Sequence, residues 1–537
     1  MPAAGRIQLY DATLRDGMQG EGMSLTAAEK VRVVHKLDEL GVQIVEAGFP
    51  ASNPKEEELF ALLAHETFVN TEIAAFGMTR RKGVAAADDV ALRVLVDSFA
   101  PISTIVGKTW GLHLEKVVRV DREENLAMIA ESVAFLREHG KRVIYDAEHF
   151  FDAWRDDEAY ALRCLRAAAE AGAETLSLCD TNGSSLPHQI AAATARVVGE
   201  LGATVRVAIH AHNDCECGVA NSLAAVDAGA RQVQGTMNGI GERTGNANLT
   251  SIIGNLELKM GYEALPSGHL EKLTETAHFV DELLNKLPDP NQPFVGRNAF
   301  AHKGGLHVAG VRADASTFEH VDPELLGNQR ELLVSELAGK ATVIEKAEQA
   351  GLALDDAAAA RVIEQVKELE HEGHQFEAAN ASFELLMRRE SGEYEPLFTL
   401  ESWRVIIEKQ RGGKVATEAT IKLWADGERY VHTAEGNGPV HALDAALRGA
   451  ITARHPHLAD IELVNFKVRI LDETKGSDAR IRVLVDASDG VETWGSIGVS
   501  TNLIEASWQA LVDSLEHPMQ PGRALSPAEA AAVRPAP

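Results

Sequence analysis

Hydrophobic and polar positions follow two alternating patterns along residues 1–275 of the chain, one typical of strands and one typical of helices. Short β-branched and aliphatic runs are separated by longer stretches in which apolar residues recur at helical spacing, as in AAEKVRVVHKLDEL. The predicted helical stretches include residues 27–40, 125–139 and 221–228. The predicted strands are residues 7–10, 42–46, 72–76, 92–96, 142–146, 175–179, 205–210 and 232–236.

Three of the helical stretches end at a glycine that leads into the next strand, in HGKRV, AGAETL and AGARQV. A glycine at the C-terminal cap of a helix is typical of such a junction. Strands that alternate with helices over residues 1–275 indicate an α/β protein with a (β/α)8 TIM barrel, a fold of about 250 residues. An open doubly wound sheet is the alternative that this alternation leaves open.

The remaining chain changes character twice. Residues 276–395 combine helical stretches with acidic runs and a loop rich in Gly and His, and we interpret them as helical linker subdomains; the charged segment 352–372 predicts a solvated helix pair. Residues 396–520 repeat a plan of strand, turn, strand, Gly loop and helix, which predicts an α+β domain of duplicated ββα units. Residues 521–537 are rich in Pro and Ala and predict a flexible tail.

Composition narrows the possible partners. The chain has 537 residues, with 52 Lys and Arg against 80 Asp and Glu, and the net charge of −28 repels nucleic acids and anionic membranes. No apolar run approaches the roughly 20 residues of a membrane span, the first residues do not resemble a secretory leader, and four cysteines make no disulfide framework. We therefore expect a cytoplasmic protein with neither a nucleic-acid nor a membrane partner.

Polar side chains that could carry chemistry follow several of the predicted strands, where the active sites of TIM barrels lie. Arg15 and Asp16 come after the first strand, in a Gly-rich loop. His210 and His212 are two apart at the end of the seventh strand, so both imidazoles point to one face of it. Two imidazoles beside an acid form a partial shell for a divalent metal. Core histidines bonded to the backbone are the alternative.

Other strand ends offer weaker candidates. Cys215 and Cys217 would complete a closed two-His, two-Cys zinc site, although both fall where the next helix is expected to begin. The loop GTMNGIGERTGNANL after the eighth strand would suit a CoA-type phosphate group, or a metal held in part by Asn246. Asp146 and Glu148 share one face at the end of the fifth strand, and CDTNGSS after the sixth would bind ligand oxygens or simply form a turn.

Three separated motifs carry a resemblance to a known family. TLRDG after the first strand, HAHND after the seventh and GERTGNANL after the eighth resemble the metal-dependent barrels of the 2-isopropylmalate, homocitrate and citramalate synthases. The resemblance covers nearly the whole chain, including the linker and the duplicated C-terminal domain. Within the family, the segments YDAEHFFD, LCDTNG, ARQVQGT, HKGGLHV and TFEHVDPELLGN are most similar to the citramalate synthases.

The resemblance implies a Claisen condensation of acetyl-CoA with pyruvate. Pyruvate would bind a divalent metal (Mg, Mn or Zn) through its keto and carboxylate oxygens, and the enolate of acetyl-CoA would add to the ketone. Water would then cleave the thioester and release citramalate. Matching of the motifs implies four metal ligands, which are Asp16, His210, His212 and Asn246.

The resemblance also implies roles for further residues. Arg15 would stabilise oxyanion charge on the keto acid, Thr181 would contact its carboxylate, and Glu148 would orient metal-bound groups or water. His307 in the linker would be an acid/base supplied by the partner subunit of a homodimer, with His302 as the second choice. The duplicated C-terminal domain would be regulatory and would bind isoleucine as a feedback inhibitor.

Two local features qualify this picture. The family usually has Tyr where this chain has Phe318, so His320 or a water would have to replace the hydroxyl group. The basic cluster Arg80, Arg81 and Lys82 would contact CoA phosphates, or would be a solvated helix start.

Three other functions remain as alternatives. Specificity for a longer keto acid, as in 2-isopropylmalate or homocitrate synthase, differs by methylene groups worth only about 1–3 kcal/mol each in an apolar pocket. A carbon–carbon lyase of the hydroxymethylglutaryl-CoA lyase type would carry Cys in the loop after the eighth strand, and residues 235–249 contain none. A metabolite sensor on an inactive barrel would not need the intact set of Arg, Asp and two His.

Overall fold

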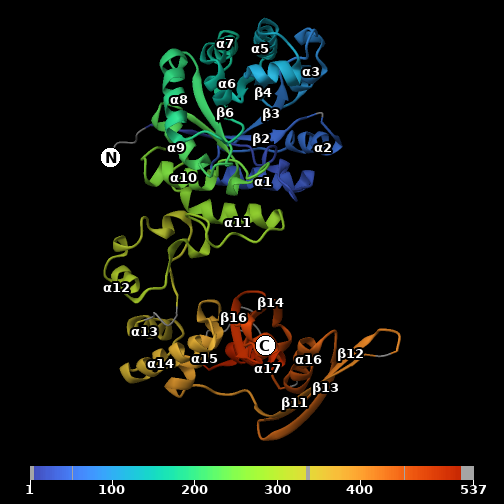
Figure 1. Cartoon of the computed structure of the whole chain (residues 1–537), viewed down its shortest axis with the longest axis vertical. Coiled ribbons are helices and arrows are strands. Elements are labelled where there is room, and N and C mark those ends of the chain that lie inside the picture. The colour runs from blue at the N-terminus through green and yellow to red at the C-terminus, as the bar shows by residue number, and fades with distance from the viewer. Residues whose placement is uncertain (1–4, 51, 334–338, 410, 453, 522–537) are drawn as a thin grey trace, which may run out of the picture. The chain divides into compact units, whose positions relative to one another are not determined.

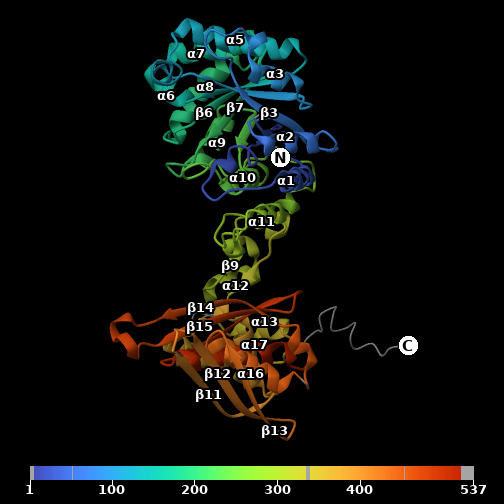
Figure 2. The same cartoon turned by 90° about the vertical axis from the view of Figure 1, so that its right-hand side faces the viewer.

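The computed structural model describes residues 5–50, 52–333, 339–409, 411–452 and 454–521 (Figures 1 and 2). The chain divides into two compact units, Met1–Phe300 with Glu319–Arg330, and Ala301–Phe318 with Glu331–Pro537. The predicted tail lies outside the described residues from residue 522 onward. Within the described residues, no helix has both the length and the apolar character needed to cross a membrane.

The first unit contains the predicted TIM barrel. Eight parallel strands pair in chain order, and β1 closes the barrel by pairing with β8, which excludes the open doubly wound sheet. Every residue of β2 and β6 is buried, as expected for parallel strands covered on both faces. The strands are β1 (Gln8–Asp11), β2 (Ile44–Gly48), β3 (Glu72–Met78), β4 (Ile102–Lys108), β5 (Arg142–Glu148), β6 (Thr175–Asp180), β7 (Arg206–Ala211) and β8 (Gln232–Gly235).

Helices surround the barrel (Figure 1). Gly140, Gly172 and Gly229, the glycines of the three predicted breaks, all have positive φ angles and so end their helices as expected. The helices of this unit are α1 (Ala27–Leu40), α2 (Pro54–Leu63), α3 (Val90–Asp97), α4 (Gly111–His113), α5 (Arg122–Glu138), α6 (Phe150–Asp156), α7 (Glu158–Glu170), α8 (Pro187–Leu201), α9 (Gly218–Asp227), α10 (Leu249–Leu258) and α11 (Leu273–Leu283).

Helix α1 shows how the local sequence specifies an element. The Thr26 side chain accepts from the Glu29 backbone N–H while Glu29 accepts from the Thr26 N–H, a reciprocal capping box at the first turn. Gly41 ends the helix in the left-handed region, at a φ of 97°. The buried face of α1 includes Val33, Val34, Leu37 and Leu40, whose spacing follows the helical period.

The prediction of the fourth strand at residues 92–96 was wrong. These residues belong to α3, because Asp89 caps the backbone N–H groups of Ala91 and Leu92 and begins a helix there. Leu92 and Leu95 are buried at a helical spacing of three, which a short aliphatic run does not distinguish from a strand. The fourth strand is β4, in the later segment ISTIVGK.

The second unit begins with helices and ends with two sheets. The stretch 352–372, predicted as a solvated helix pair, contains one helix, α14, which begins at Asp356. The face of this helix with Val362 and Val366 is buried, so that prediction was wrong. The elements before the sheets are β9 (Ala301–His302), α12 (Gly305–Ala313), β10 (Glu331–Leu332), α13 (Lys340–Gln349), α14 (Asp356–Glu372) and α15 (Asn380–Ser391).

Duplication in the C-terminal region is confirmed, but each copy has three strands instead of two. The extra strands, β11 and β14, were missed and lie at an edge of their antiparallel sheets. Helix α16 packs on the first sheet and α17 on the second (Figure 2). The elements are β11 (Thr399–Lys409), β12 (Val415–Ala425), β13 (Glu428–Gly436), α16 (Pro439–Ile451), β14 (Glu462–Ile470), β15 (Ile481–Ser488), β16 (Thr493–Ser500) and α17 (Leu503–Glu516).

Gly436 and Gly498 occupy corresponding positions in the two copies, and the same close packing requires glycine at both. A Cβ atom at Gly436 would lie 2.5 Å from the backbone nitrogen of Ala442 in α16. A Cβ atom at Gly498 would lie 1.9 Å from the carbonyl oxygen of Ala506 in α17. In both copies the helix approaches the last strand so closely that only glycine fits.

Candidate metal centre

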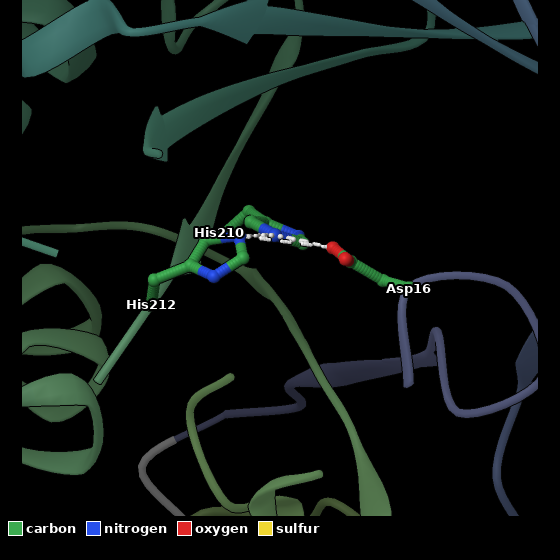
Figure 3. A group of neighbouring side chains, drawn as sticks. All are labelled: Asp16, His210 and His212. Carbon is green, nitrogen blue, oxygen red and sulfur yellow. Dashed lines mark hydrogen bonds and ion pairs between the residues drawn. The ribbon is translucent and has the colours of Figure 1, made fainter. Parts of the chain in front are cut away.

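Three of the predicted metal ligands converge at the C-terminal end of the barrel. Asp16 lies in the loop after β1, and its carboxylate faces the rings of His210 and His212 on and after β7 (Figure 3). Asp16 Oδ2 lies 3.2 Å from His210 Nε2 and 3.8 Å from His212 Nε2, and the two Nε2 atoms are 3.4 Å apart. All three side chains are buried. This group offers two imidazole nitrogens and one carboxylate oxygen to a single point.

The loop that carries Asp16 is fixed by the buried end of β1. Asp11 accepts hydrogen bonds from the backbone N–H and the hydroxyl group of Thr13, at 2.9 and 2.8 Å. The Thr13 hydroxyl group accepts in turn from the backbone N–H of Met237, which lies after β8. Burial raises the pKa of Asp11 to about 7. These contacts join the loop after β1 to the loop after β8 beside the candidate site.

His210 is oriented by a residue that sequence reasoning missed. His210 Nδ1 lies 3.0 Å from Gln234 Oε1, so Nδ1–H donates and leaves the Nε2 lone pair for a cation. Gln234 Nε2 donates to Asp146 Oδ1 at 3.3 Å, which fixes the direction of the amide. The sequence did contain an indication of this role. Gln232 and Gln234 are two apart on a predicted barrel strand, so their polar side chains lie on the same face of it.

Asn246 presents a buried amide oxygen with no hydrogen-bond donor among the described residues. Its backbone forms an antiparallel bridge with His212, and its Nδ2 donates weakly to Ile240 O at 3.4 Å. A Cβ atom at Gly241 would lie 2.3 Å from Asn246 Nδ2, so glycine there leaves the space that the amide fills. An orphaned oxygen is costly to bury and fits a cation ligand. The donor set thus suits a divalent metal.

The charges of the group are strongly coupled. Burial alone raises the pKa of Asp16, but Arg15 and His210 outweigh it and hold the pKa well below its usual range. Burial and the neighbouring His210 lower the pKa of His212 to about 4. Burial also opposes the charged form of His210, yet Asp16 raises the pKa of His210 above its usual value. Asp16 is therefore ionised and His212 neutral at pH 7, as metal ligands must be.

Arg15 lies beside the ligand group in a largely buried position. Its Nε donates to Glu46 Oε2 at 2.5 Å, its Nη1 lies 3.4 Å from Asp16 Oδ2, and its guanidinium packs 4.0 Å from the centroid of the Phe76 ring. Tyr10 donates to the second oxygen of Glu46 at 2.6 Å. Glu46 was also missed from the sequence, although an acid in the middle of the apolar run VQIVEAGF signals a buried partner.

The cysteine alternative receives no support. Cys215 is exposed and Cys217 is half-buried at the start of α9. Among the described residues, the group of possible metal ligands that contains His210 and His212 also contains Asp16, but it contains no cysteine.

Two further candidate residues lie at the C-terminal ends of the neighbouring strands β5 and β6. The Thr181 hydroxyl group accepts from the backbone N–H of His149 at 2.9 Å, and Glu148 forms an ion pair with Lys108. Asp180, from the same motif as Thr181, binds the backbone and side chain of Ser185 and so serves a turn.

The linker histidines fall into different environments. His307, on α12 in the second unit, is exposed and stacks on Phe318 with ring centroids 4.2 Å apart. His302 is buried in β9. His320 belongs to the first unit, where its ring stacks on Phe300 and burial lowers its pKa.

The basic cluster after β3 is already neutralised in part. Arg80 is buried and pairs with Glu124 at 2.9 Å and Glu131 at 2.6 Å. Arg81 pairs with a buried aspartate, and Lys82 donates to a backbone carbonyl group. These contacts favour a local structural role over contact with phosphate groups.

Three family models together match most of the chain. The HMGL-like model matches residues 6–280, the homocitrate synthase post-HMGL domain-like model residues 294–374, and the LeuA allosteric (dimerisation) domain residues 377–519. The chain is 47% identical to an (R)-citramalate synthase of Aquifex aeolicus over 516 residues, covering 95% of this chain and 97% of that protein. This chain belongs to the citramalate synthase family.

Two further relatives place the chain within this family. An (R)-citramalate synthase of Streptomyces coelicolor is 48% identical over 513 residues, covering 95% of this chain and 96% of that protein. A probable 2-isopropylmalate synthase of Methanopyrus kandleri is 34% identical over 512 residues, covering 94% of this chain and 97% of that protein. The family membership inferred from the motifs TLRDG, HAHND and GERTGNANL is confirmed.

Proposed function

We propose that this chain condenses acetyl-CoA with pyruvate to give (R)-citramalate and CoA. The sequence identity of 47–48% to two (R)-citramalate synthases over 95% of the chain carries the proposal. The convergence of Asp16, His210 and His212 at the C-terminal end of the barrel supports it, because such a reaction needs an electrophilic ketone.

The proposed metal ligands are Asp16, His210, His212 and Asn246. A divalent cation held there would supply a Lewis acid to the keto and carboxylate oxygens of pyruvate. Arg15 lies 3.4 Å from Asp16 and carries a fixed positive charge, since Glu46 and Asp16 raise its pKa despite its burial. We assign to Arg15 the stabilisation of negative charge on the keto oxygen as the new carbon–carbon bond forms.

Remaining roles follow the chemistry that the reaction requires. A base removes a methyl proton from acetyl-CoA, the resulting carbanion adds to the keto carbon, and water then cleaves the thioester into carboxylate and CoA thiol. We assign contact with the keto-acid carboxylate to Thr181 and the orientation of water or metal-bound groups to Glu148. His307 is the proposed acid/base, supplied by a second copy of the chain, and the LeuA dimerisation domain supports such a dimer.

A panel of keto acids tests the proposal. Purified chain with acetyl-CoA and Mg²⁺, Mn²⁺ or Zn²⁺ is expected to release CoA fastest with pyruvate, compared with 2-ketoisovalerate and 2-ketoglutarate. The product should be the R enantiomer of citramalate by chiral chromatography. Faster turnover of either longer keto acid would overturn the choice of substrate and favour 2-isopropylmalate or homocitrate synthase, the second candidate suggested by the Methanopyrus relative.

We also propose that the duplicated C-terminal domain binds isoleucine as a feedback inhibitor. The match of residues 377–519 to an allosteric domain supports regulation at this region, while the identity of the inhibitor rests on citramalate being a precursor of isoleucine. Inhibition of the full chain by isoleucine, absent with leucine or valine at the same concentration, is the expected result. Equal inhibition by leucine would contradict it.

A further inference from the structure

A second group of metal-binding side chains lies at the ends of β4 and β5, apart from the candidate metal centre. His113, Glu148 and His149 each bring one ligand atom to within 4.8 Å of the others. Ligands of a tetrahedral zinc lie about 3.4 Å apart, so small side-chain rotations would close the group around one ion. Two imidazoles and one carboxylate are the protein ligands of many zinc sites with an open position.

His149 is held in place for this role. Its Nδ1 lies 3.1 Å from Asp152 Oδ2, so Nδ1–H donates to the carboxylate and Nε2 stays available. Asp152 is itself anchored by Arg155 at 2.6 Å and Asn182 at 2.9 Å. His149 adopts a left-handed conformation, with φ 54° and ψ 35°, which a non-glycine residue rarely occupies. A strained, doubly supported histidine indicates a functional constraint.

His113 supplies a nitrogen with no other use in the described residues. Its Nδ1 is buried without a hydrogen-bond partner. Its ring stacks on Trp110, at a centroid distance of 5.5 Å, and packs against the tilted ring of His149, at 4.2 Å.

Glu148 connects this group to catalysis and has a resident cation. One of its oxygens forms an ion pair with Lys108, whose ammonium group is mostly buried. A divalent ion bound to the two histidines would compete with Lys108 for this carboxylate. It would also remove Glu148 from the orienting role assigned to it above.

We propose that His113, Glu148 and His149 form an inhibitory site for a second divalent transition metal, of the class that imidazole prefers, such as zinc. Binding itself depends only on the geometry of these three side chains, whereas the inhibition rests on the proposed function, because it acts through Glu148. Excess zinc would occupy this site after the first centre is filled and would lower the rate of condensation.

The experiment counts zinc ions in the full chain by equilibrium dialysis with elemental analysis, and needs no substrate. The parent is expected to bind two ions per chain, and His113→Phe, which keeps the stacking on Trp110, only one. The matched control His188→Phe alters an exposed histidine and should keep two ions. One ion in the parent, or two in His113→Phe, would overturn the proposed site. The single ion retained by His113→Phe also shows that this variant is folded.

Two further measurements separate the site from its effect. Lys108→Met removes the competing ammonium group and should tighten the second zinc at least tenfold, and unchanged or weaker affinity would contradict the ligand role of Glu148. In the condensation assay, zinc beyond one equivalent should inhibit the parent while His113→Phe keeps its rate. Equal inhibition of both would refute the inhibitory role. If no variant turns over pyruvate, the proposed function fails while the zinc count still decides the site.

Discussion

The hydrogen bond between Gln234 and His210 makes a sharp prediction about the candidate metal centre. Replacing Gln234 by leucine keeps the volume of the side chain nearly constant but removes the acceptor 3.0 Å from His210 Nδ1 and the donor 3.3 Å from Asp146. His210 then loses the contact that fixes its tautomer and ring direction. Metal affinity is therefore expected to fall although no ligand has been changed.

The magnitude follows from the same contacts. Loss of an outer-shell partner of a metal-bound histidine weakens binding by about 10–100-fold, which corresponds to roughly 1.4–2.7 kcal/mol. Two buried polar groups also lose a partner, at about 1–3 kcal/mol each in the free energy of unfolding of the metal-free protein. The variant should thus lose both metal affinity and stability.

Competition with a chromophoric chelator measures the metal dissociation constant, and urea denaturation of the chelated protein measures stability. Gln232→Leu is the matched control, because Gln232 is a buried amide on the same strand and face that pairs with Gln8 at 2.8 Å instead of His210. Gln232 also accepts a long contact from Gln234 Nε2, at 3.5 Å, but its replacement leaves the bond between Gln234 and His210 in place. This control should therefore lose stability but keep metal affinity within about threefold, short of the effect of an outer-shell partner. If Gln234→Leu binds metal as the parent does, or Gln232→Leu loses as much affinity, the assigned role of Gln234 is refuted.

Three further predictions concern stability. Gly498→Ala should lower the free energy of unfolding of the second unit by at least about 1–3 kcal/mol, because the new Cβ atom would lie 1.9 Å from Ala506 O. Lys30→Met should cost about 3–5 kcal/mol, because it leaves the buried carboxylate of Glu56, now 2.5 Å from Lys30 Nζ, without a partner. Asp11→Asn should gain stability relative to the parent as pH rises from about 4 to about 7, because burial raises the Asp11 pKa from 3.8 to about 7. Over this range the unfolded parent has lost the Asp11 proton while the folded parent still holds it, so the parent becomes less stable as pH rises.

Each of these three predictions has its own control, and urea denaturation measures the free energy of unfolding of every variant. Gly490→Ala adds a methyl group where nothing lies within 4 Å, although its φ of 85° also adds strain, so Gly498→Ala must cost more than this control. Lys30→Met combined with Glu56→Gln should recover part of the loss, and no recovery would show that the lost charge is not the cause. A stability difference between Asp11→Asn and the parent that stays constant between pH 4 and pH 7 would contradict the raised pKa.

The barrel and most of its strands followed from local patterns in the sequence. Seven of the eight predicted strands overlap observed ones, because each is an aliphatic run closed by a turn signal. The error at residues 92–96 arose because a short run of Val and Leu fits both the helical and the strand periodicity. Only the N-terminal cap at Asp89 indicates a helix there. Strand β11 was missed because its apolar residues, such as Ile407, follow no clean alternation. Strand β14 was missed although its segment VNFKVRI alternates apolar and polar residues, and the apolar side chains of that segment, such as Val464, are exposed.

The candidate site was predicted less completely than the fold. Asp16, His210 and His212 could be chosen because they follow strands whose ends meet at one face of a barrel. Gln234 and Glu46 act through contacts between strands that are distant in sequence, and only the closed barrel brings them beside their partners. The second histidine group was not anticipated, because His113 follows β4, the strand that the sequence pattern misplaced.

The proposed ligands of the candidate metal centre come from opposite ends of the barrel sequence. Asp16 follows the first strand and His210 lies on the seventh, and the strand pairing that brings them together requires β8, at residues 232–235. During synthesis from the N-terminus, more than 200 residues must therefore be added after Asp16 before the barrel can close and bring the other proposed ligands beside it. A cation bound by Asp16, His210, His212 and Asn246 together would require a closed barrel. Its binding would link the first-synthesised and the last-synthesised strands of the barrel.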